Sequence, residues 1–403
     1  YLNAVEDNSD GTIVVTTADS ANGATVTVTG MGVTDTCTVS SNACTVTVAA
    51  ADLQSLTDGT TYTINVALTA DAAGNTATSD TGDTFVYDIT APSISDVVPS
   101  WGTYLNAVED NSDGTIVVTT ADSANGATVT VTGMGVTDTC TVSSNACTVT
   151  VAAADLQSLT DGTTYTINVA LTADAAGNTA TSDTGDTFVY DITAPSISNV
   201  VPSWGTYLNA AEDNADGTIV VTTSGAEDGQ TVTVTGMGVT DTCSLSSDTC
   251  TVTVAAADLQ ALTDGTTYTI TVNVDDAAEN SATPDTGDTF VYDITAPSIS
   301  DVVPSWGAYL NAVEDNSDGT IVVTTADSAN GATVTVTGMG VTDTCTVSSN
   351  ACTVTVAAAD LQSLTDGTTY TINVALTADA AGNTATSDTG DTFVYDITAP
   401  SIS

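Results

Sequence analysis

The chain has 403 residues, of which 50 are Asp or Glu and none is Lys, Arg or His, so its formal net charge is −50. Phosphate contacts to nucleic acid and attraction to anionic lipids both require Lys or Arg, and histidine bases or Schiff-base lysines are equally impossible. No apolar run approaches the ~20 residues that span a bilayer. The composition therefore excludes nucleic-acid partners and predicts no membrane insertion in this segment.

The rest of the composition indicates a folded, β-rich chain. Hydrophobic residues make up 41% of the sequence, and the abundant Val, Ile and Thr favour strands. This apolar fraction is high enough to build hydrophobic cores, so we do not expect the disorder that a high net charge often brings.

An internal repeat of about 103 residues defines the domain organisation. The segment that starts at Tyr1-Leu-Asn-Ala recurs at Tyr104, Tyr207 and Tyr309, and a period of this length matches a whole domain. With Asp-Ile-Thr-Ala-Pro as the joint, the predicted domains are 1–90, 91–193, 194–295 and 296–398, and residues 399–403 start a further repeat. On this phasing the first domain lacks its opening strand, and we expect the sequence to be part of a longer array.

Strand patterns fill each repeat. Tyr62, Ile64, Val66 and Leu68 alternate with small or polar residues, which predicts a half-buried strand. Other stretches of period two follow, separated by turn-forming pairs such as Asn22-Gly23. About seven short strands per repeat indicate an antiparallel β-sandwich, in which Tyr62 would form a tyrosine corner.

Each repeat contains two cysteines with six residues between them. A turn at Ser40-Ser41 would place Cys37 opposite Cys44 across a hairpin, which permits a disulfide. A zinc site would need further ligands, and paired buried thiols are the alternative. The predicted disulfides, which indicate an oxidising extracytoplasmic setting, are Cys37–Cys44, Cys140–Cys147, Cys243–Cys250 and Cys345–Cys352.

Several motifs occur in the same order in every repeat. They include Leu208-Asn-Ala-Ala-Glu212, the segment 255–268, Asp71-Ala-Ala-Gly-Asn75 and Asp88-Ile-Thr-Ala-Pro92. In this order they resemble the bacterial immunoglobulin-like domains of giant surface adhesins and biofilm-associated proteins. The resemblance implies an all-β chain of four tandem immunoglobulin-like antiparallel β-sandwich domains in an extended rod, located extracellularly on the cell surface.

Domains of that family act as spacers and often bind calcium where one domain meets the next. The resemblance implies that the Asp-Ala-Ala-Gly-Asn turn and the last Asp of one domain meet the Glu-Asp pair of the following domain. Carboxylate oxygens in such a cluster suit Ca²⁺ better than a transition metal. The implied ligand sets are Asp71, Asp88, Glu109 and Asp110; Asp174, Asp191, Glu212 and Asp213; and Asp276, Asp293, Glu314 and Asp315.

Three features have alternative interpretations. The acidic residues are also consistent with solvated turns and surface charge. The Thr-rich outer strand faces fit β-propensity, O-linked glycans or an ice-binding array. The tryptophans either cap the sandwich ends or offer a ring for stacking on a sugar, and they are Trp101, Trp204 and Trp306.

These observations predict a structural spacer or stalk of an extracellular bacterial fibre or giant adhesin, with calcium at its joints and neighbouring repeats as its partners. The alternative function is an adhesive module whose repeats themselves bind a glycan or a partner. Near-identical copies favour the spacer, because specialised binding usually makes copies diverge. Carboxylate pairs could in principle hydrolyse glycosides, but no cationic or imidazole group could assist them, so we expect no enzyme.

Overall fold

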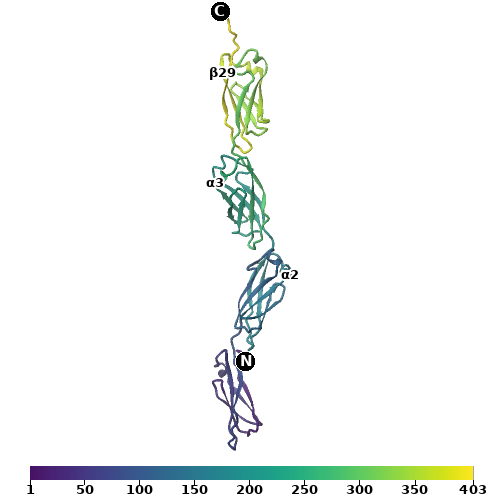
Figure 1. The fold of residues 1–403 in the computed structure, drawn as a ribbon, viewed down its shortest axis with the longest axis vertical. Helices are drawn as coiled ribbons and strands as arrows, with labels where there is room; N and C mark the ends of the chain where they lie inside the picture. The colour runs from purple at the N-terminus through teal and green to yellow at the C-terminus, as the bar shows by residue number, and fades with distance from the viewer. Residues whose placement is uncertain (403) are drawn as a thin grey trace. The chain divides into compact units, whose positions relative to one another are not determined.

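The computed structural model describes residues 1–402, apart from the side chains of residues 184, 389 and 390. It divides into two compact units, Tyr1–Thr193 and Ala194–Ser403, and each unit contains two β-sandwiches in chain order (Figure 1). The predicted joints fall just before β7 (Ser93–Pro99), β15 (Ser196–Pro202) and β23 (Ser298–Pro304). The further repeat predicted over 399–403 ends at Ser403, which lies outside the described residues.

The second domain shows the strand order. One sheet has the order β12 (Ala146–Val151), β9 (Gly114–Ala121), β7. The other has the order β11 (Asp138–Thr141), β10 (Thr128–Thr132), β13 (Thr163–Leu171), β14 (Asp183–Tyr190), β8 (Tyr104–Leu105). The pairs are antiparallel, as predicted, except for the short β14–β8 pair, which is parallel. The short helices are η2 (Glu109–Asn111) and α2 (Ala153–Leu156).

The third and fourth domains repeat this topology. The third contains β15, β17 (Gly217–Ser224) and β20 (Thr249–Val254) in one sheet, and β16 (Tyr207–Leu208), β22 (Asp285–Tyr292), β21 (Thr266–Val274), β18 (Thr231–Thr235) and β19 (Asp241–Ser244) in the other, with α3 (Ala256–Leu259). In the fourth domain, one sheet contains β23, β25 (Gly319–Ala326) and β28 (Ala351–Val356). The other sheet contains β24 (Tyr309–Leu310), β30 (Asp388–Tyr395), β29 (Thr368–Leu376), β26 (Thr333–Thr337) and β27 (Asp343–Thr346). The short helices of this domain are η3 (Glu314–Asn316) and α4 (Ala358–Leu361).

The first domain has the same order with fewer strands. Its sheets are β1 (Gly11–Thr16) with β4 (Ala43–Val48), and β3 (Asp35–Thr38), β2 (Thr25–Thr29), β5 (Thr60–Leu68) and β6 (Asp80–Tyr87), with η1 (Glu6–Asn8) and α1 (Ala50–Leu53). No helix in residues 1–402 is long and apolar enough to cross a membrane.

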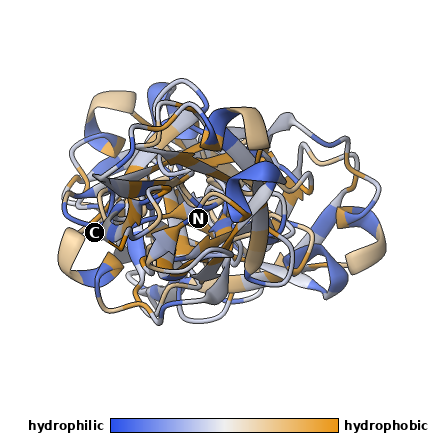
Figure 2. Cartoon of the chain, turned by 90° about the horizontal axis from the view of Figure 1, so that it is seen from above, coloured by the Kyte–Doolittle hydropathy of each residue, from blue (hydrophilic) through white to orange (hydrophobic). Residues whose placement is uncertain are grey.

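Apolar residues at alternate strand positions fill the space between the sheets. Val129 and Val131 on β10 are fully buried, whereas the threonines between and beside them are partly exposed. Orange apolar residues and pale or blue polar ones are interspersed through the strands and loops in Figure 2. Each such valine contributes about 1.5–3 kcal/mol to folding through burial, so the period-two pattern is sufficient to direct one face of each strand inward.

Trp101 is part of this core. Its ring is 7% exposed and packs edge-to-face on Phe188, with ring centroids 5.3 Å apart. Gly114 makes room for it, because a Cβ at that position would lie 2.4 Å from Cζ3 of Trp101. Trp204 and Trp306 pack in the same way. The tryptophans therefore cap the cores, as one interpretation predicted, and their buried rings are not available for stacking on a sugar.

The predicted tyrosine corner is confirmed. The Tyr62 hydroxyl accepts a hydrogen bond of 2.8 Å from the amide of Thr57, five residues earlier in the chain. This bond fastens the loop after α1 to the start of β5. The same bond is made by Tyr165, Tyr268 and Tyr370.

The predicted disulfides are present, but they do not close a hairpin within one sheet. Cys37 lies on β3 and Cys44 on β4, and these strands belong to different sheets, so the bond ties the two sheets together. The turn between them is centred on Ser41 and Asn42, both at positive φ, rather than on Ser40-Ser41. The other pairs are Cys140–Cys147, Cys243–Cys250 and Cys345–Cys352.

Candidate site at the joints between domains

The linker that begins at Asp88, the last aspartate of the first domain, is held in place by hydrogen bonds to two other parts of that domain. The amide of Asp88 donates to the carbonyl oxygen of Leu2 at 3.0 Å. Asp58 holds the next two residues, because the Ile89 amide donates to its Oδ1 and the Thr90 hydroxyl to its Oδ2. The Thr90 bond is the main reason that the pKa of Asp58 lies below its ordinary value. The linker therefore leaves the domain in a defined direction.

The Asp-Ala-Ala-Gly-Asn segment forms a turn that its own aspartate organises. In the second domain, Oδ1 of Asp174 accepts hydrogen bonds from the amides of Ala176 and Asn178, both at 2.9 Å. Oδ2 of Asp174 accepts a further bond from Nδ2 of Asn178. Asp71 makes the same bonds in the first domain. All of these bonds lie within one domain, so the turn can form without a neighbour.

Three hydrogen bonds join the first domain to this turn of the second. Nδ2 of Asn178 donates to the carbonyl oxygen of Asp88 at 2.8 Å, and the Ala4 amide donates to Oδ1 of Asn178 at 3.4 Å. Nδ2 of Asn3 donates to the carbonyl oxygen of Ala176 at 2.7 Å. The joint between the third and fourth domains has the same bonds: Asn383 to Asp293 (2.7 Å), Ala210 to Asn383 (3.3 Å) and Asn209 to Ala381 (2.8 Å).

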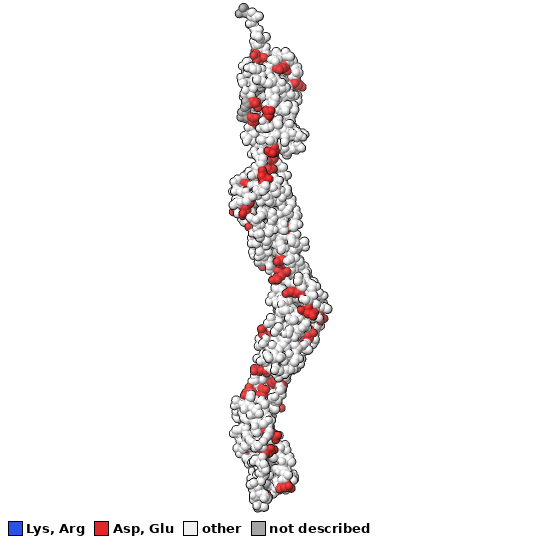
Figure 3. All heavy atoms as spheres, viewed as in Figure 1, with Lys and Arg blue, Asp and Glu red and all other residues white. Residues whose placement is uncertain are grey.

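Negative charge is concentrated at both joints. Burial, followed by the nearby charge of Asp174, raises the pKa of Asp88 above its ordinary value, and burial and Asp379 raise that of Asp293 in the same way. Figure 3 shows acidic side chains gathered where the two domains of each unit meet. The chain has no Lys, Arg or His to balance them. Each joint therefore brings together carboxylates that repel one another.

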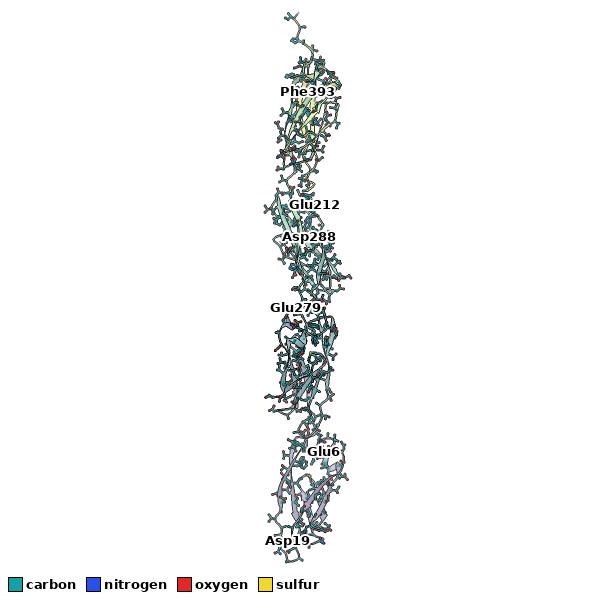
Figure 4. All side chains as sticks on the ribbon, turned by 90° about the vertical axis from the view of Figure 1, so that its right-hand side faces the viewer. Glu6, Asp19, Glu212, Glu279, Asp288 and Phe393 are labelled. Carbon is teal, nitrogen blue, oxygen red and sulfur yellow. A yellow bond between two sulfur atoms is a disulfide. The ribbon has the colours of Figure 1, made fainter. Side chains whose placement is uncertain are left out.

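The predicted ligand sets are not brought together, and this corrects the expectation from the sequence. Asp71 precedes β6 and Asp88 follows it, so the eight-residue strand, roughly 26 Å long, places them at opposite ends of the domain. Figure 4 shows Glu6 and Asp19, which borders the same hollow as Asp71, at opposite ends of the first domain. The same separation applies to Asp174 and Asp191 and to Asp276 and Asp293.

The Glu-Asp pairs were also assigned to the wrong neighbour. Each pair lies at the end of its own domain where the last long strand finishes, because the aspartate there bonds to that strand's final tyrosine. The bonds are Tyr190 to Asp110, Tyr292 to Asp213 and Tyr395 to Asp315, and Glu109, Glu212 and Glu314 precede these aspartates. The joint inside each compact unit therefore combines the opening loop and last aspartate of one domain with the Asp-Ala-Ala-Gly-Asn turn of the next, which is the reverse of the prediction.

Calcium chemistry fits this combination in part. The first joint offers the carboxylates of Asp88 and Asp174, with Glu6 on the opening loop beside Asn3. These are hard oxygen donors of the kind Ca²⁺ prefers, and backbone carbonyls or water can complete such a set. Within the described residues, no three Asp, Glu or Cys side chains are already arranged around one metal position.

The amide residues that join the domains were not predicted from the sequence. Asn3 and Asn178 are not acidic, so the carboxylate pattern that suggested calcium ligands does not include them. A signal was present, because the Asn of Leu-Asn-Ala and the Asn of the Asp-Ala-Ala-Gly-Asn turn recur in every repeat at these positions.

Comparison with known proteins found no matching family model and no matching curated protein. Among solved structures, a Ca²⁺-stabilized adhesin that helps an Antarctic bacterium bind ice is 31% identical, over 98% of this chain and 96% of that chain, with a TM-score of 0.36. A 1.5-MDa bacterial ice-binding adhesin is 26% identical over 76% of this chain and 98% of that chain, with a TM-score of 0.36.

A single bacterial immunoglobulin-like domain from the M. primoryensis ice-binding adhesin is 29% identical, over 24% of this chain and 96% of that chain, with a TM-score of 0.19. Because the TM-scores are low, the assignment rests on the 31% identity over nearly the whole of both chains. The chain belongs to the bacterial immunoglobulin-like tandem-repeat domains of large surface adhesins.

Proposed function

We propose that this chain is a non-enzymatic stalk segment of an extracellular bacterial adhesin, and that calcium stiffens the joints between its domains. The observation that supports it most is the recurrence of one joint arrangement. The bonds around Asn178 and Asp88 are repeated around Asn383 and Asp293, and each set lies beside a pair of carboxylates without a basic partner. A segment that sets reach and stiffness needs such a repeated connection.

Calcium bound at a joint would supply positive charge where the carboxylates repel. Asp88, Asp174 and Glu6 would hold it at the first joint, and Asp293, Asp379 and Glu212 at the joint between the third and fourth domains. The chain itself brings these oxygens together, because the hydrogen bonds to Asp58 direct the linker and Asp174 shapes the facing turn. That a relative is described as Ca²⁺-stabilized supports the choice of metal.

Calorimetric calcium titration of the full chain, combined with small-angle scattering, tests this function. We expect calcium uptake at millimolar concentration or below, and chelation should make the particle more flexible while far-UV circular dichroism keeps its β signal. The cores and disulfides do not involve the joint residues, which is why β-structure should persist. No uptake, or no change in flexibility on chelation, would contradict the proposal.

A matched pair of variants makes the titration specific. Asp293→Asn removes a carboxylate at a joint, whereas Asp396→Asn alters the equivalent residue of the fourth domain, which is exposed. Asp293→Asn should weaken calcium uptake and Asp396→Asn should not. Equal effects of the two variants would show that any uptake reflects general surface charge.

A further inference from the structure

The asparagine of the joint turn has all its side-chain hydrogen-bonding groups engaged. Asn178 is 6% exposed and Asn383 is 7% exposed. In Asn383, Nδ2 donates to the carbonyl oxygen of Asp293 and to Oδ2 of Asp379, while Oδ1 accepts from the Ala210 amide. One amide therefore contacts its own turn, the last residue of the preceding domain and the opening loop of that domain.

The turn that carries this amide does not depend on the contact. In the first domain, Asn75 is exposed and still makes the internal bonds to Asp71. Its backbone amide donates to Oδ1 of Asp71 at 2.8 Å, and its Nδ2 donates to Oδ2 at 2.7 Å. The turn is thus preformed, and docking adds only the bonds to the neighbouring domain. Little conformational entropy is lost at the turn when the domains meet.

The facing surface is held just as firmly. Asp264 accepts bonds from the Ile294 amide and the Thr295 hydroxyl, which fixes the chain directly after Asp293. Asn209 holds the opening loop through its own Oδ1, which accepts bonds from Ala211 and Glu212. The carbonyl oxygen of Asp293 and the amide of Ala210 are therefore presented in fixed positions.

From this geometry we propose that Asn178 and Asn383 act as latches, by which we mean that their side-chain hydrogen bonds to the preceding domain orient adjacent domains without metal. The inference rests on the stalk role proposed above and adds a second element to its joints. An amide suits the position because it offers both donors and an acceptor, whereas an aspartate would lack the donors and would add a third carboxylate beside Asp293 and Asp379. The latch orients the domains, and calcium offsets the charge that this orientation brings together.

The third domain allows a clean measurement. Its opening loop, residues 208–216, reads Leu-Asn-Ala-Ala-Glu-Asp-Asn-Ala-Asp and differs from the other copies, so its peptide is identifiable by mass spectrometry. Hydrogen–deuterium exchange of this peptide in the full chain reports the Ala210 amide, which bonds to Asn383. In chelator, Asn383→Ala should speed exchange of this peptide about two- to tenfold, as expected for loss of one hydrogen bond.

Two controls separate the latch from other effects. Asn75→Ala makes the same change in an exposed turn of the first domain and should leave peptide 208–216 unchanged. Asn383→Asp keeps oxygen acceptors but loses the donors, so exchange should be fast in chelator and slow again with calcium. If Asn383→Ala behaves like Asn75→Ala in chelator, the latch is overturned.

The outcomes also distinguish this inference from the proposed function. A chain that takes up no calcium but shows the Asn383→Ala effect has the latch without the metal, so the calcium proposal alone fails. A chain whose peptide 208–216 responds to chelation but not to Asn383→Ala has joints held by the metal, so the latch fails. Unchanged exchange in the fourth-domain peptide 388–395 would show that Asn383→Ala leaves that sandwich folded.

Discussion

The hydroxyl of Tyr190 donates a hydrogen bond of 2.7 Å to Oδ2 of Asp110 in the interior of the second domain. The two residues are 80 positions apart and are 2% and 6% exposed. The bond fastens the opening loop to the end of β14, next to the linker, and it also satisfies a buried carboxylate that has no basic partner. An aspartate that looked like a calcium ligand in the sequence is therefore a structural residue.

Removing this hydroxyl should destabilise the second domain. Tyr190→Phe leaves Asp110 buried without its donor, which costs about 1–3 kcal/mol in the free energy of unfolding. Asp110→Asn keeps an acceptor and should cost less. Thermal unfolding of the full chain, compared with Tyr104→Phe as a control for loss of a partly exposed tyrosine hydroxyl, measures the difference. Equal melting of the two tyrosine variants would contradict this role.

Alkaline pH should weaken the same bond. Burial and the hydrogen bond to Asp110 raise the pKa of Tyr190 from 10.0 to about 12. Below pH 10 the tyrosine is protonated in both states, so its contribution to stability is complete. Between pH 10 and about 12 the unfolded chain ionises first, so stability falls as pH rises. Denaturant unfolding across this range should show the decline, and a flat profile would argue against it.

The third domain contains a strained turn that a single substitution should relieve. Glu279 has φ +67°, in the left-handed region that Gly74, Gly177 and Gly382 occupy at the equivalent positions. This conformation costs a residue with a Cβ about 1 kcal/mol. Glu279→Gly should therefore stabilise the turn and slow hydrogen exchange around residues 275–281. Glu279→Gln, which removes the charge and keeps the strain, is the control. Similar slowing in both variants would assign the effect to charge instead.

The disulfides should contribute directly to the stability of each sandwich. Mass spectrometry without reduction should find the chain eight hydrogens lighter than its thiol form, and free thiols under aerobic conditions would contradict the pairing. Replacing both Cys140 and Cys147 by alanine releases a loop of about eight residues and should cost about 2.5 kcal/mol in that domain. A loss confined to domain docking, with no change in unfolding, would exclude a role in joining the sheets.

Charge at the joint should make docking depend on pH when calcium is absent. Because the pKa of Asp293 is raised in the docked joint, protonation favours docking, and docking weakens as pH rises from 3.8 through the raised value. Asp293→Asn imitates the protonated form, so in chelator it should dock better than the parent chain at neutral pH. Exchange of peptide 208–216 reports this, and faster exchange in Asp293→Asn would contradict the sign.

Much of this protein was determined by local sequence alone. Alternation such as Thr-Val-Thr-Val-Thr over 128–132 predicts a strand with one buried face, because successive side chains point to opposite sides. The tyrosine corner of Tyr62 spans five residues and each disulfide spans seven. Such features depend on backbone geometry within a few residues, and a resemblance carried by the order of motifs was sufficient to identify the family.

Only the tertiary structure decided which loops share a joint. Asp88 contacts the turn of Asn178, 90 residues later, and Asp58 binds Thr90 across 32 residues. The end of the sandwich at which a loop lies depends on the direction and pairing of all the strands before it. A charge pattern carries no such information. The sequence therefore predicted acidic joints but assigned Asp71 and Asp110 to the joint between the first and second domains, whereas the strand order places both residues away from that joint.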